Sequence, residues 1–205
     1  MTTEQGSKPV SDITWDAMRW VNPPPSAEVT DGVLEVTTGT DTDFWRTTSY
    51  GFVHDSGHFL GTPLVGDAGV ELTFSGDFMA QFDHAGLMLR AAPDLWLKAG
   101  VELTDGELFA SVVVTIGRSD WSVAPVELGR SDRPITIRAS RVGDSVTIRY
   151  GVGPGAELRL LRVAHLPEAA AFDVGPFCCS PTRTGLVVRF DPMQIGPPDA
   201  RLHAE

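Results

Sequence analysis

The sequence has few cysteines and lysines, and it has no long apolar run. Its only two cysteines, Cys178 and Cys179, are adjacent among 205 residues. Neighbouring residues of a strand point to opposite faces, and a disulfide between neighbours would be strained. We therefore expect two reduced thiols in a cytoplasmic protein, with a vicinal redox pair as the alternative. No segment approaches the ~20 apolar residues of a membrane span, and residues 1–10 lack the apolar core of a secretory signal.

Basic side chains are also scarce. Lysine and arginine total 16 against 27 aspartates and glutamates, which gives a net charge of -11. A nucleic-acid partner needs a basic stripe that neutralises phosphates, and an anionic membrane surface attracts polybasic segments. The composition therefore predicts neither a nucleic acid nor a membrane as a partner.

The sequence lacks a long stretch of helical periodicity. Instead, short segments with strand periodicity are separated by turns, and the chain contains 21 glycines and 15 prolines. The predicted strands cover 33–36, 70–75, 85–90, 95–103, 108–116, 135–141, 145–150, 158–163 and 186–190. This pattern predicts an all-β fold, a two-sheet antiparallel β-sandwich. We expect a single domain over residues 13–191, with a flexible N-terminal tail over 1–12 and a C-terminal tail or closing loop over 192–205.

One hairpin can be assigned residue by residue. Asp105 and Gly106 form a two-residue turn of the type I′ kind. The turn pairs apolar residues on one face, namely Leu103 with Leu108, Val101 with Ala110, Ala99 with Val112 and Leu97 with Val114. A shift by one residue would mix the two faces of the hairpin, so the register is well determined.

The other face of this strand carries Trp96, Lys98, Gly100 and Glu102. An aromatic ring, an ammonium, bare backbone and a carboxylate in one row are unusual for a face that meets only bulk water. Matching the apolar residues of the preceding segment places Arg90 opposite Trp96 and His84 opposite Glu102. We therefore expect this face to be a ligand site, which requires that it is not buried against the other sheet.

Five segments in order carry a family resemblance: 42–46, 82–86, 96–102, 119–122 and 178–181. Together they resemble the poorly characterised family typified by the yeast regulator-of-enolase protein, over about residues 20–190. The resemblance implies the concanavalin A-like lectin/glucanase sandwich, or jelly roll, and it implies no known reaction. His84 departs from the family pattern, in which an amide side chain stands at this position.

We interpret the protein as a non-catalytic binding or regulatory module for a carbohydrate or a small polar or anionic metabolite. Tryptophan rings could stack on a sugar while charged groups bond its hydroxyls. The candidate ligand-binding residues are Trp96, Lys98, Glu102, Arg90, His84, Asp43, Trp45, Asp120 and Trp121. Lys98 could meet an anion, and the alternative is a lysine that pairs with an acid. We expect no cofactor and no metal, because the spacing of His54 and His58 converges only on a helix and these residues flank a turn.

Two other functions remain open. The first is a glycoside hydrolase that uses Glu102 as its catalytic residue. Such an enzyme needs a second carboxyl group ~5–10 Å away, for which Asp43, Asp83 and Asp120 are the candidates. The second is a protein-interaction module, which the name of the yeast protein suggests.

Overall fold

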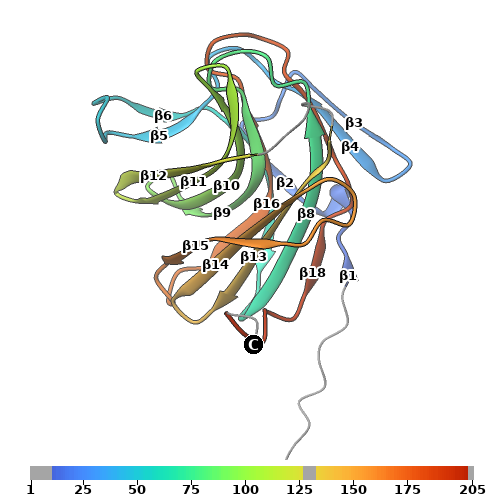
Figure 1. Ribbon diagram of the computed structural model, residues 1–205, viewed down its shortest axis with the longest axis vertical. Coiled ribbons are helices and arrows are strands. Elements are labelled where there is room, and N and C mark those ends of the chain that lie inside the picture. The colour runs from blue at the N-terminus through green and yellow to red at the C-terminus, as the bar shows by residue number, and fades with distance from the viewer. Residues whose placement is uncertain (1–10, 127–132, 203–205) are drawn as a thin grey trace, which may run out of the picture.

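The computed structural model describes residues 11–126 and 133–202, which form two large antiparallel sheets packed face to face (Figure 1). Within these residues, the first sheet has nine strands. Seven follow the order β15 (Arg159–His165), β14 (Ser145–Val152), β13 (Ile135–Val142), β8 (Ala68–Gly76), β17 (Val187–Phe190), β4 (Val33–Thr37) and β3 (Ser26–Thr30). The strand β18 (Gln194–Gly196) pairs with β8 and with β1 (Ser11–Asp12).

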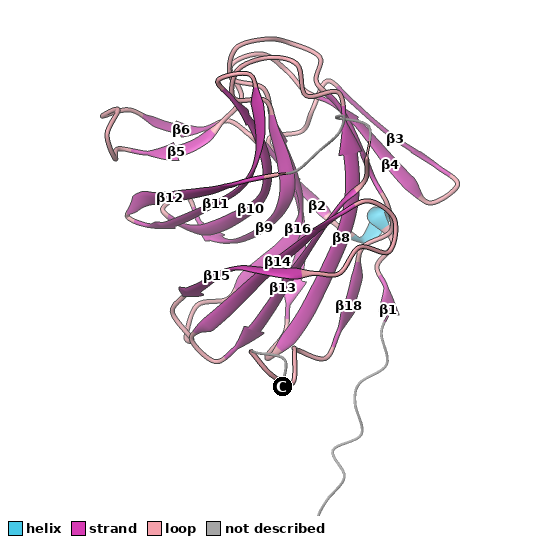
Figure 2. Cartoon of the chain, viewed as in Figure 1, coloured by secondary structure: helices cyan, strands magenta, loops and turns pink. Residues whose placement is uncertain are grey.

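The second sheet has seven strands in the described part of the chain. Their order is β12 (Arg118–Pro125), β11 (Glu107–Ile116), β10 (Leu95–Thr104), β9 (His84–Ala92), β16 (Phe172–Cys179), β7 (His58–Leu64) and β2 (Arg19–Val21). A separate hairpin consists of β5 (Phe44–Arg46) and β6 (Val53–Asp55). The only described helix is a single 3₁₀ turn over Trp15–Ala17, which Figure 2 shows at the edge of the strands. No helix in residues 11–126 and 133–202 has the length and apolar character to cross a membrane.

The main core lies between the two sheets, and it confirms the alternation expected from the sequence. Leu97, Ala99 and Val101 of β10 are at most 1% exposed and belong to one buried cluster with Leu72 and Phe74 of β8. Burial of a leucine or phenylalanine side chain stabilises a fold by roughly 1.5–3 kcal/mol. The all-β sandwich is therefore held by the apolar faces of strands that the sequence pattern identifies.

The predicted hairpin register is confirmed. In β10 and β11, Leu103 pairs with Leu108 and Glu102 with Phe109. Asp105 and Gly106 have φ of 52° and 82°, as a type I′ turn requires. The pairing with β9 is also as expected, because Glu102 lies opposite His84.

A second, smaller core lies on the outer face of the second sheet. Figure 1 shows that the strands β9–β12 curve so that this face is concave, and that the β5–β6 hairpin lies over it, away from β13–β15. The buried members of this cluster are Phe44, Trp45, Phe59, Met88, Trp96, Val113, Phe177 and Cys179. The candidate face is thus not buried against the other sheet, but the hairpin covers one end of it.

The two ends of the described chain meet at the first sheet. Ser11 pairs with Ile195 and Asp12 with Gln194, so residues 11 and 12 form a strand where the sequence suggested a tail. Nearby, the Asp199 carboxylate accepts hydrogen bonds from the Nε atoms of Arg138 at 2.7 Å and Arg149 at 3.1 Å. The segment from residue 194 to residue 199 is accordingly attached to the sheet, although its composition alone does not distinguish a tail from a closing loop.

Candidate functional site

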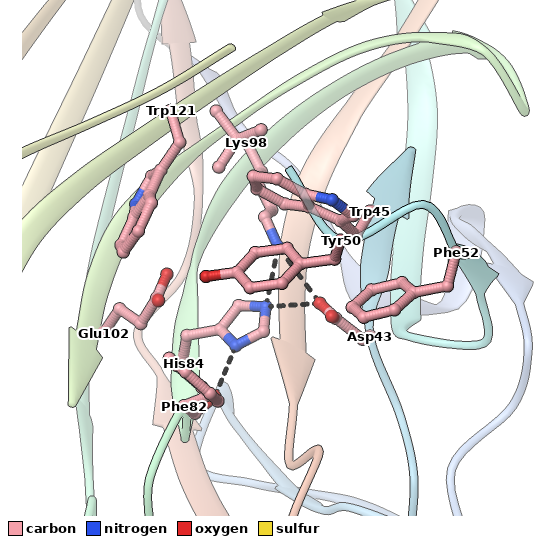
Figure 3. A pocket seen from close by; sticks show the side chains of 10 residues that line it. Asp43, Trp45, Tyr50, Phe52, Phe82, His84, Lys98, Glu102 and Trp121 are labelled. Atoms are coloured by element: carbon pink, nitrogen blue, oxygen red, sulfur yellow. Dashed lines mark hydrogen bonds and ion pairs between the residues drawn. The ribbon is translucent and has the colours of Figure 1, made fainter. Parts of the chain in front are cut away.

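A pocket of about 290 Å³ opens on the concave face, between the β5–β6 hairpin and the strands β9–β12 (Figure 3). Its residues come from segments far apart in the sequence. They are Asp43, Trp45, Tyr50, Phe52, Phe82, His84, Lys98, Glu102, Val113 and Trp121. Six of the nine predicted ligand-binding residues are among them, namely Asp43, Trp45, His84, Lys98, Glu102 and Trp121.

Aromatic rings form the walls. Trp45 makes edge contacts with Tyr50 and Trp121, at centroid distances of 5.5 and 6.4 Å. Tyr50 stacks on Phe52 at 5.4 Å. The two indole N–H groups are used within the protein, since Trp45 donates to the Thr48 carbonyl and Trp121 to Ser111 Oγ, each at 3.0 Å. The walls therefore offer ring surfaces to a ligand.

Lys98 lies at the floor of the pocket and is 4% exposed. Its ammonium lies 2.9 Å from the Phe44 carbonyl, 2.9 Å from His84 Nε2 and 3.3 Å from Asp43 Oδ1. An ammonium has three donor hydrogens, so these three acceptors use all of them. The charge of Lys98 is balanced by Asp43. Lys98 therefore pairs with an acid of the protein, which was the alternative to contact with an anionic ligand.

His84 is a neutral acceptor in this arrangement. Its Nδ1 lies 2.7 Å from the Phe82 carbonyl and donates to it, which leaves the Nε2 lone pair for the Lys98 ammonium. Burial, together with the positive charge of Lys98, lowers the pKa of His84 to about 4. A second positive charge is therefore excluded from the floor near neutral pH.

Asp43 stays ionised beside Lys98. Burial raises its pKa, but the positive charge of Lys98 and the hydrogen bond from the Phe44 amide at 2.7 Å more than offset that effect, so the pKa lies below its usual value. Asp43 Oδ1 is also 3.6 Å from His84 Nε2. These contacts within the protein all involve Oδ1 of Asp43, whose side chain is 19% exposed.

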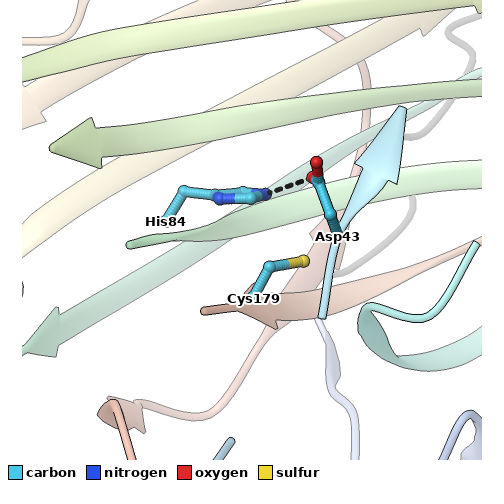
Figure 4. A group of neighbouring side chains, drawn as sticks. All are labelled: Asp43, His84 and Cys179. Atoms are coloured by element: carbon cyan, nitrogen blue, oxygen red, sulfur yellow. Dashed lines mark ion pairs between the residues drawn. The ribbon is translucent and has the colours of Figure 1, made fainter. Parts of the chain in front are cut away.

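Asp43, His84 and Cys179 present possible metal-ligand atoms within 4.8 Å of one another (Figure 4). The ammonium of Lys98 already contacts the Asp43 and His84 atoms that a metal would use. Burial also raises the pKa of the Cys179 thiol well above its usual value, whereas metal binding needs a thiolate. The arrangement of Asp43, His84 and Cys179 therefore suits the ammonium of Lys98 better than a metal ion.

Glu102 is the remaining charged group of the pocket and is 7% exposed. Its carboxylate accepts hydrogen bonds from Ser111 Oγ at 3.2 Å and Thr104 Oγ1 at 3.4 Å. Burial raises the pKa of Glu102, and the charge of Lys98 opposes this only in part. Among the residues that the structure describes, no cation forms an ion pair with Glu102.

Three predicted site residues lie elsewhere, which corrects the sequence interpretation. Trp96 is fully buried in the second core, where its ring lies 6.1 Å from that of Phe44. Arg90 pairs with Asp55, with Nη2 2.9 Å from Oδ2. Asp120 is on the surface and pairs with Arg162 at 3.2 Å. The β5–β6 hairpin covers the end of the face that carries Trp96 and Arg90.

The sequence reasoning missed four pocket residues, Tyr50, Phe52, Phe82 and Val113. The strands of the β5–β6 hairpin are only three residues each, too short for a periodic signal. The only signal for this hairpin was the spacing of Tyr50 and Phe52. Two aromatic residues two positions apart in a polar segment point to the same face of an extended chain. Val113 could have been placed from its predicted pairing with Lys98.

Comparisons with known proteins identify the family and agree with the fold. A family model described as "Protein of unknown function (DUF1349)" matches residues 20–198. The Saccharomyces cerevisiae protein named Regulation of enolase protein 1 is 36% identical over 185 residues, covering 87% of this chain and 89% of the yeast protein. A crystal structure of a functionally unknown protein from the same yeast has a TM-score of 0.85 at 34% identity, covering 92% of this chain and 100% of that one.

More distant structures share the fold. A GH43 protein from Bacillus licheniformis has a TM-score of 0.67 at 15% identity, covering 88% of this chain and 37% of that one. At this identity the likeness shows the fold alone, a concanavalin A-like β-sandwich. With the family match over residues 20–198 and the yeast relative at 36% identity, the chain belongs to the DUF1349 family.

Proposed function

We propose that the protein is a non-catalytic binding module of the cytoplasm that takes a small ligand with an apolar ring face and polar edges, such as a carbohydrate, in the concave-face pocket. The observation that carries the proposal is the pairing of aromatic walls with a buried polar floor in one cavity of about 290 Å³. This volume is at the lower end of the ~300–1,000 Å³ of ligand sites, so the pocket suits a short ligand.

The floor favours a carbohydrate over an anionic metabolite. The Lys98 ammonium directs its hydrogens to Asp43, His84 and the Phe44 carbonyl. An anion would have to replace one of these partners and would meet the Glu102 carboxylate in the same pocket. A sugar ring can stack on Trp45 or Trp121 without displacing any of these bonds.

The contacts of Asp43 favour binding over glycoside hydrolysis. Asp43 and Glu102 both line the pocket, so two carboxyl groups are present. The raised pKa of Glu102 would suit a general acid. A hydrolase also needs a carboxylate that is free to act as nucleophile or base. In Asp43 the Oδ1 atom accepts from both Lys98 and the Phe44 amide, which lowers the reactivity of this carboxylate.

A regulatory role through a protein partner is the second candidate. The yeast relative is named for the regulation of enolase. On this chain the tip of the β5–β6 hairpin exposes Tyr50, Phe52 and Val53, at 54%, 42% and 51%. An exposed apolar tip of this kind is suited to a protein contact. Tyr50 and Phe52 also line the pocket, so partner and ligand would share this element.

Thermal-shift and calorimetric titration with glucose and xylose test the primary proposal. A ligand at 100 times its dissociation constant stabilises the folded state by ~2.7 kcal/mol, which raises the melting temperature by a few degrees. Trp121→Leu keeps an apolar side chain but removes the ring surface, and it should abolish the shift. Val123→Ala, on the same strand but outside the pocket, should retain it. A saturable sugar that binds equally well to Trp121→Leu would contradict the proposed location.

A further inference from the structure

Glu102 is an acid in an unusual position within the pocket. It is 7% exposed, and the groups that donate to it are the hydroxyls of Ser111 and Thr104. Trp121 donates to Ser111 Oγ, which in turn donates to Glu102, so one chain of hydrogen bonds joins the aromatic wall to the carboxylate. A buried carboxylate without a cationic partner is costly for the fold, which suggests that its partner comes from outside the protein.

The two basic side chains near Glu102 make their hydrogen bonds to other groups. Lys98 gives its three hydrogens to Asp43, His84 and the Phe44 carbonyl. His84 is neutral, because its Nδ1 donates to Phe82 while its Nε2 accepts from Lys98. Lys98 and Asp43 balance each other, so the pocket keeps one uncompensated negative charge when Glu102 is ionised.

The rings beside Glu102 also favour positive charge. Figure 3 shows the Glu102 carboxylate pointing into the pocket on the side of Trp121, with the hydroxyl end of Tyr50 directed toward the same space. The face of an aromatic ring carries partial negative charge and attracts a cation within ~6 Å of its centroid. Aromatic cages are a common setting for the recognition of quaternary ammonium groups, and a carboxylate beside the rings adds an opposite charge. The net charge of -11 on the chain would also attract cations.

We propose that the ligand carries a cationic nitrogen, and that this group binds between the carboxylate of Glu102 and the rings of Tyr50 and Trp121. The inference rests on the proposed function and specifies its ligand class, an amino sugar or another ring-bearing amine. Glu102 then determines specificity, while Trp45 and Trp121 provide the surface for the rest of the ligand.

Isothermal titration with four probes tests this inference: glucosamine, glucose, N-acetylglucosamine and tetramethylammonium. Glucosamine should bind about tenfold or more tightly than glucose or N-acetylglucosamine, because only it carries a positive charge. Glu102→Gln should remove this preference. Glu107→Gln is the matched control, since it changes the net charge equally at an exposed position on β11 that does not line the pocket.

The folding of the variant is checked separately. Glu102→Gln should retain the melting temperature of the parent or exceed it, since it removes a buried charge and preserves the shape of the side chain. If it does unfold, Tyr50→Leu provides the second test. It removes a ring at a 54% exposed position, and it should weaken glucosamine and tetramethylammonium more than glucose.

The outcomes separate the two proposals. Equal affinity for the three sugars overturns the cationic ligand and leaves the carbohydrate module standing. A glucosamine preference that survives Glu102→Gln overturns the proposed site, because the cationic group would then not bind at Glu102. Binding of tetramethylammonium that depends on Glu102, with no sugar binding, supports the cationic site and overturns the carbohydrate. No heat with any probe at millimolar concentration overturns both. Equal loss of affinity in Glu102→Gln and Glu107→Gln would attribute the preference to net charge and overturn the role of Glu102.

Discussion

The ammonium of Lys98 lies 2.9 Å from Nε2 of His84, so that two basic side chains face each other as donor and acceptor below the pocket. The contact is favourable only while His84 is neutral, because a protonated imidazole would direct a second positive charge at the ammonium. The donation from His84 Nδ1 to the Phe82 carbonyl fixes the tautomer that makes the contact possible.

The Lys98–Asp43 pair should be essential for stability. Lys98→Met removes the cation and leaves the Asp43 carboxylate, which is 19% exposed, beside a neutral imidazole. Loss of one partner of a buried pair costs about 3–5 kcal/mol, and we expect a loss near the lower value because Asp43 retains some contact with water. The check is urea denaturation of Lys98→Met, Asp43→Asn and the double variant. The loss in the double variant should be smaller than the sum of the single losses, whereas additivity would show that the pair does not interact.

The stability of the protein should fall in mild acid. The pKa of His84 is about 4 in the folded protein, against 6.5 for an ordinary histidine. Between these values the unfolded chain binds more protons at this histidine. His84 therefore lowers the free energy of unfolding by about 3 kcal/mol as the pH drops from about 6.5 to about 4. His58 contributes in the same direction, because burial lowers its pKa as well. Glu102 acts in the opposite direction, because burial raises its pKa.

Denaturation curves at several pH values check this expectation in the parent protein and in His84→Asn. The variant should show a smaller decrease between pH 6.5 and pH 4, since only the other groups still titrate. His165→Asn replaces an imidazole whose side chain is 61% exposed and should preserve the full decrease. A steep loss that is identical in His84→Asn would refute the role of this histidine.

Trp96 should behave as a core residue rather than as a ligand contact. Its side chain is fully buried against Phe44 and the Lys98 ammonium lies 5.8 Å from its ring. Trp96→Ala should lose about 3–5 kcal/mol of stability, as large-to-small substitutions of buried aromatic residues do. The free energy of unfolding of Trp96→Ala is measured by denaturation. Ligand binding is then titrated under conditions in which the variant is folded. If the Trp96→Ala variant is as stable as the parent but does not bind the ligand, Trp96 is a ligand contact after all.

Gly100 should not tolerate a side chain. A Cβ atom at this position would overlap the carbonyl oxygen of Ala85 on the neighbouring strand β9. Gly100→Ala must therefore push two paired strands apart beneath the pocket, at a cost of about 1–3 kcal/mol or more. In Gly39→Ala, by contrast, the new Cβ would meet its nearest neighbour at 3.7 Å, so this variant should be close to the parent in thermal unfolding. Equal melting temperatures for the two variants would be evidence against this contact.

Strands such as β8, β10 and β13 could be predicted from the sequence because they alternate between apolar and polar residues. The register of β10 against β11 follows from a single Asp-Gly turn, and the structure reproduces each predicted pair. Strands β7, β12 and β16 were not predicted. In β16, seven of the eight residues are buried, and its sequence shows no regular alternation of apolar and polar residues. The short strands β5 and β6 gave no signal at all.

The candidate site was predictable only in part for the same reason. The face that carries Lys98 and Glu102 follows from strand periodicity, which is a local property of the sequence. Trp96 is buried because the β5–β6 hairpin folds back over β9–β12. This long-range packing leaves no periodic pattern in the sequence. The pairing of Lys98 with Asp43 joins residues 55 positions apart, and its geometry became visible only in the folded chain.

The two adjacent thiols, Cys178 and Cys179, can be used to follow the opening of two different parts of the molecule. Cys178 belongs to the core between the sheets, and Cys179 belongs to the second core beneath the pocket. Neither thiol is more than 1% exposed, and burial raises the pKa of both. A thiol reagent can therefore modify Cys179 when the hairpin lifts from the concave face, but it reaches Cys178 only when the sheets part. The order in which two consecutive residues become labelled would show whether the pocket opens independently of the sandwich that supports it.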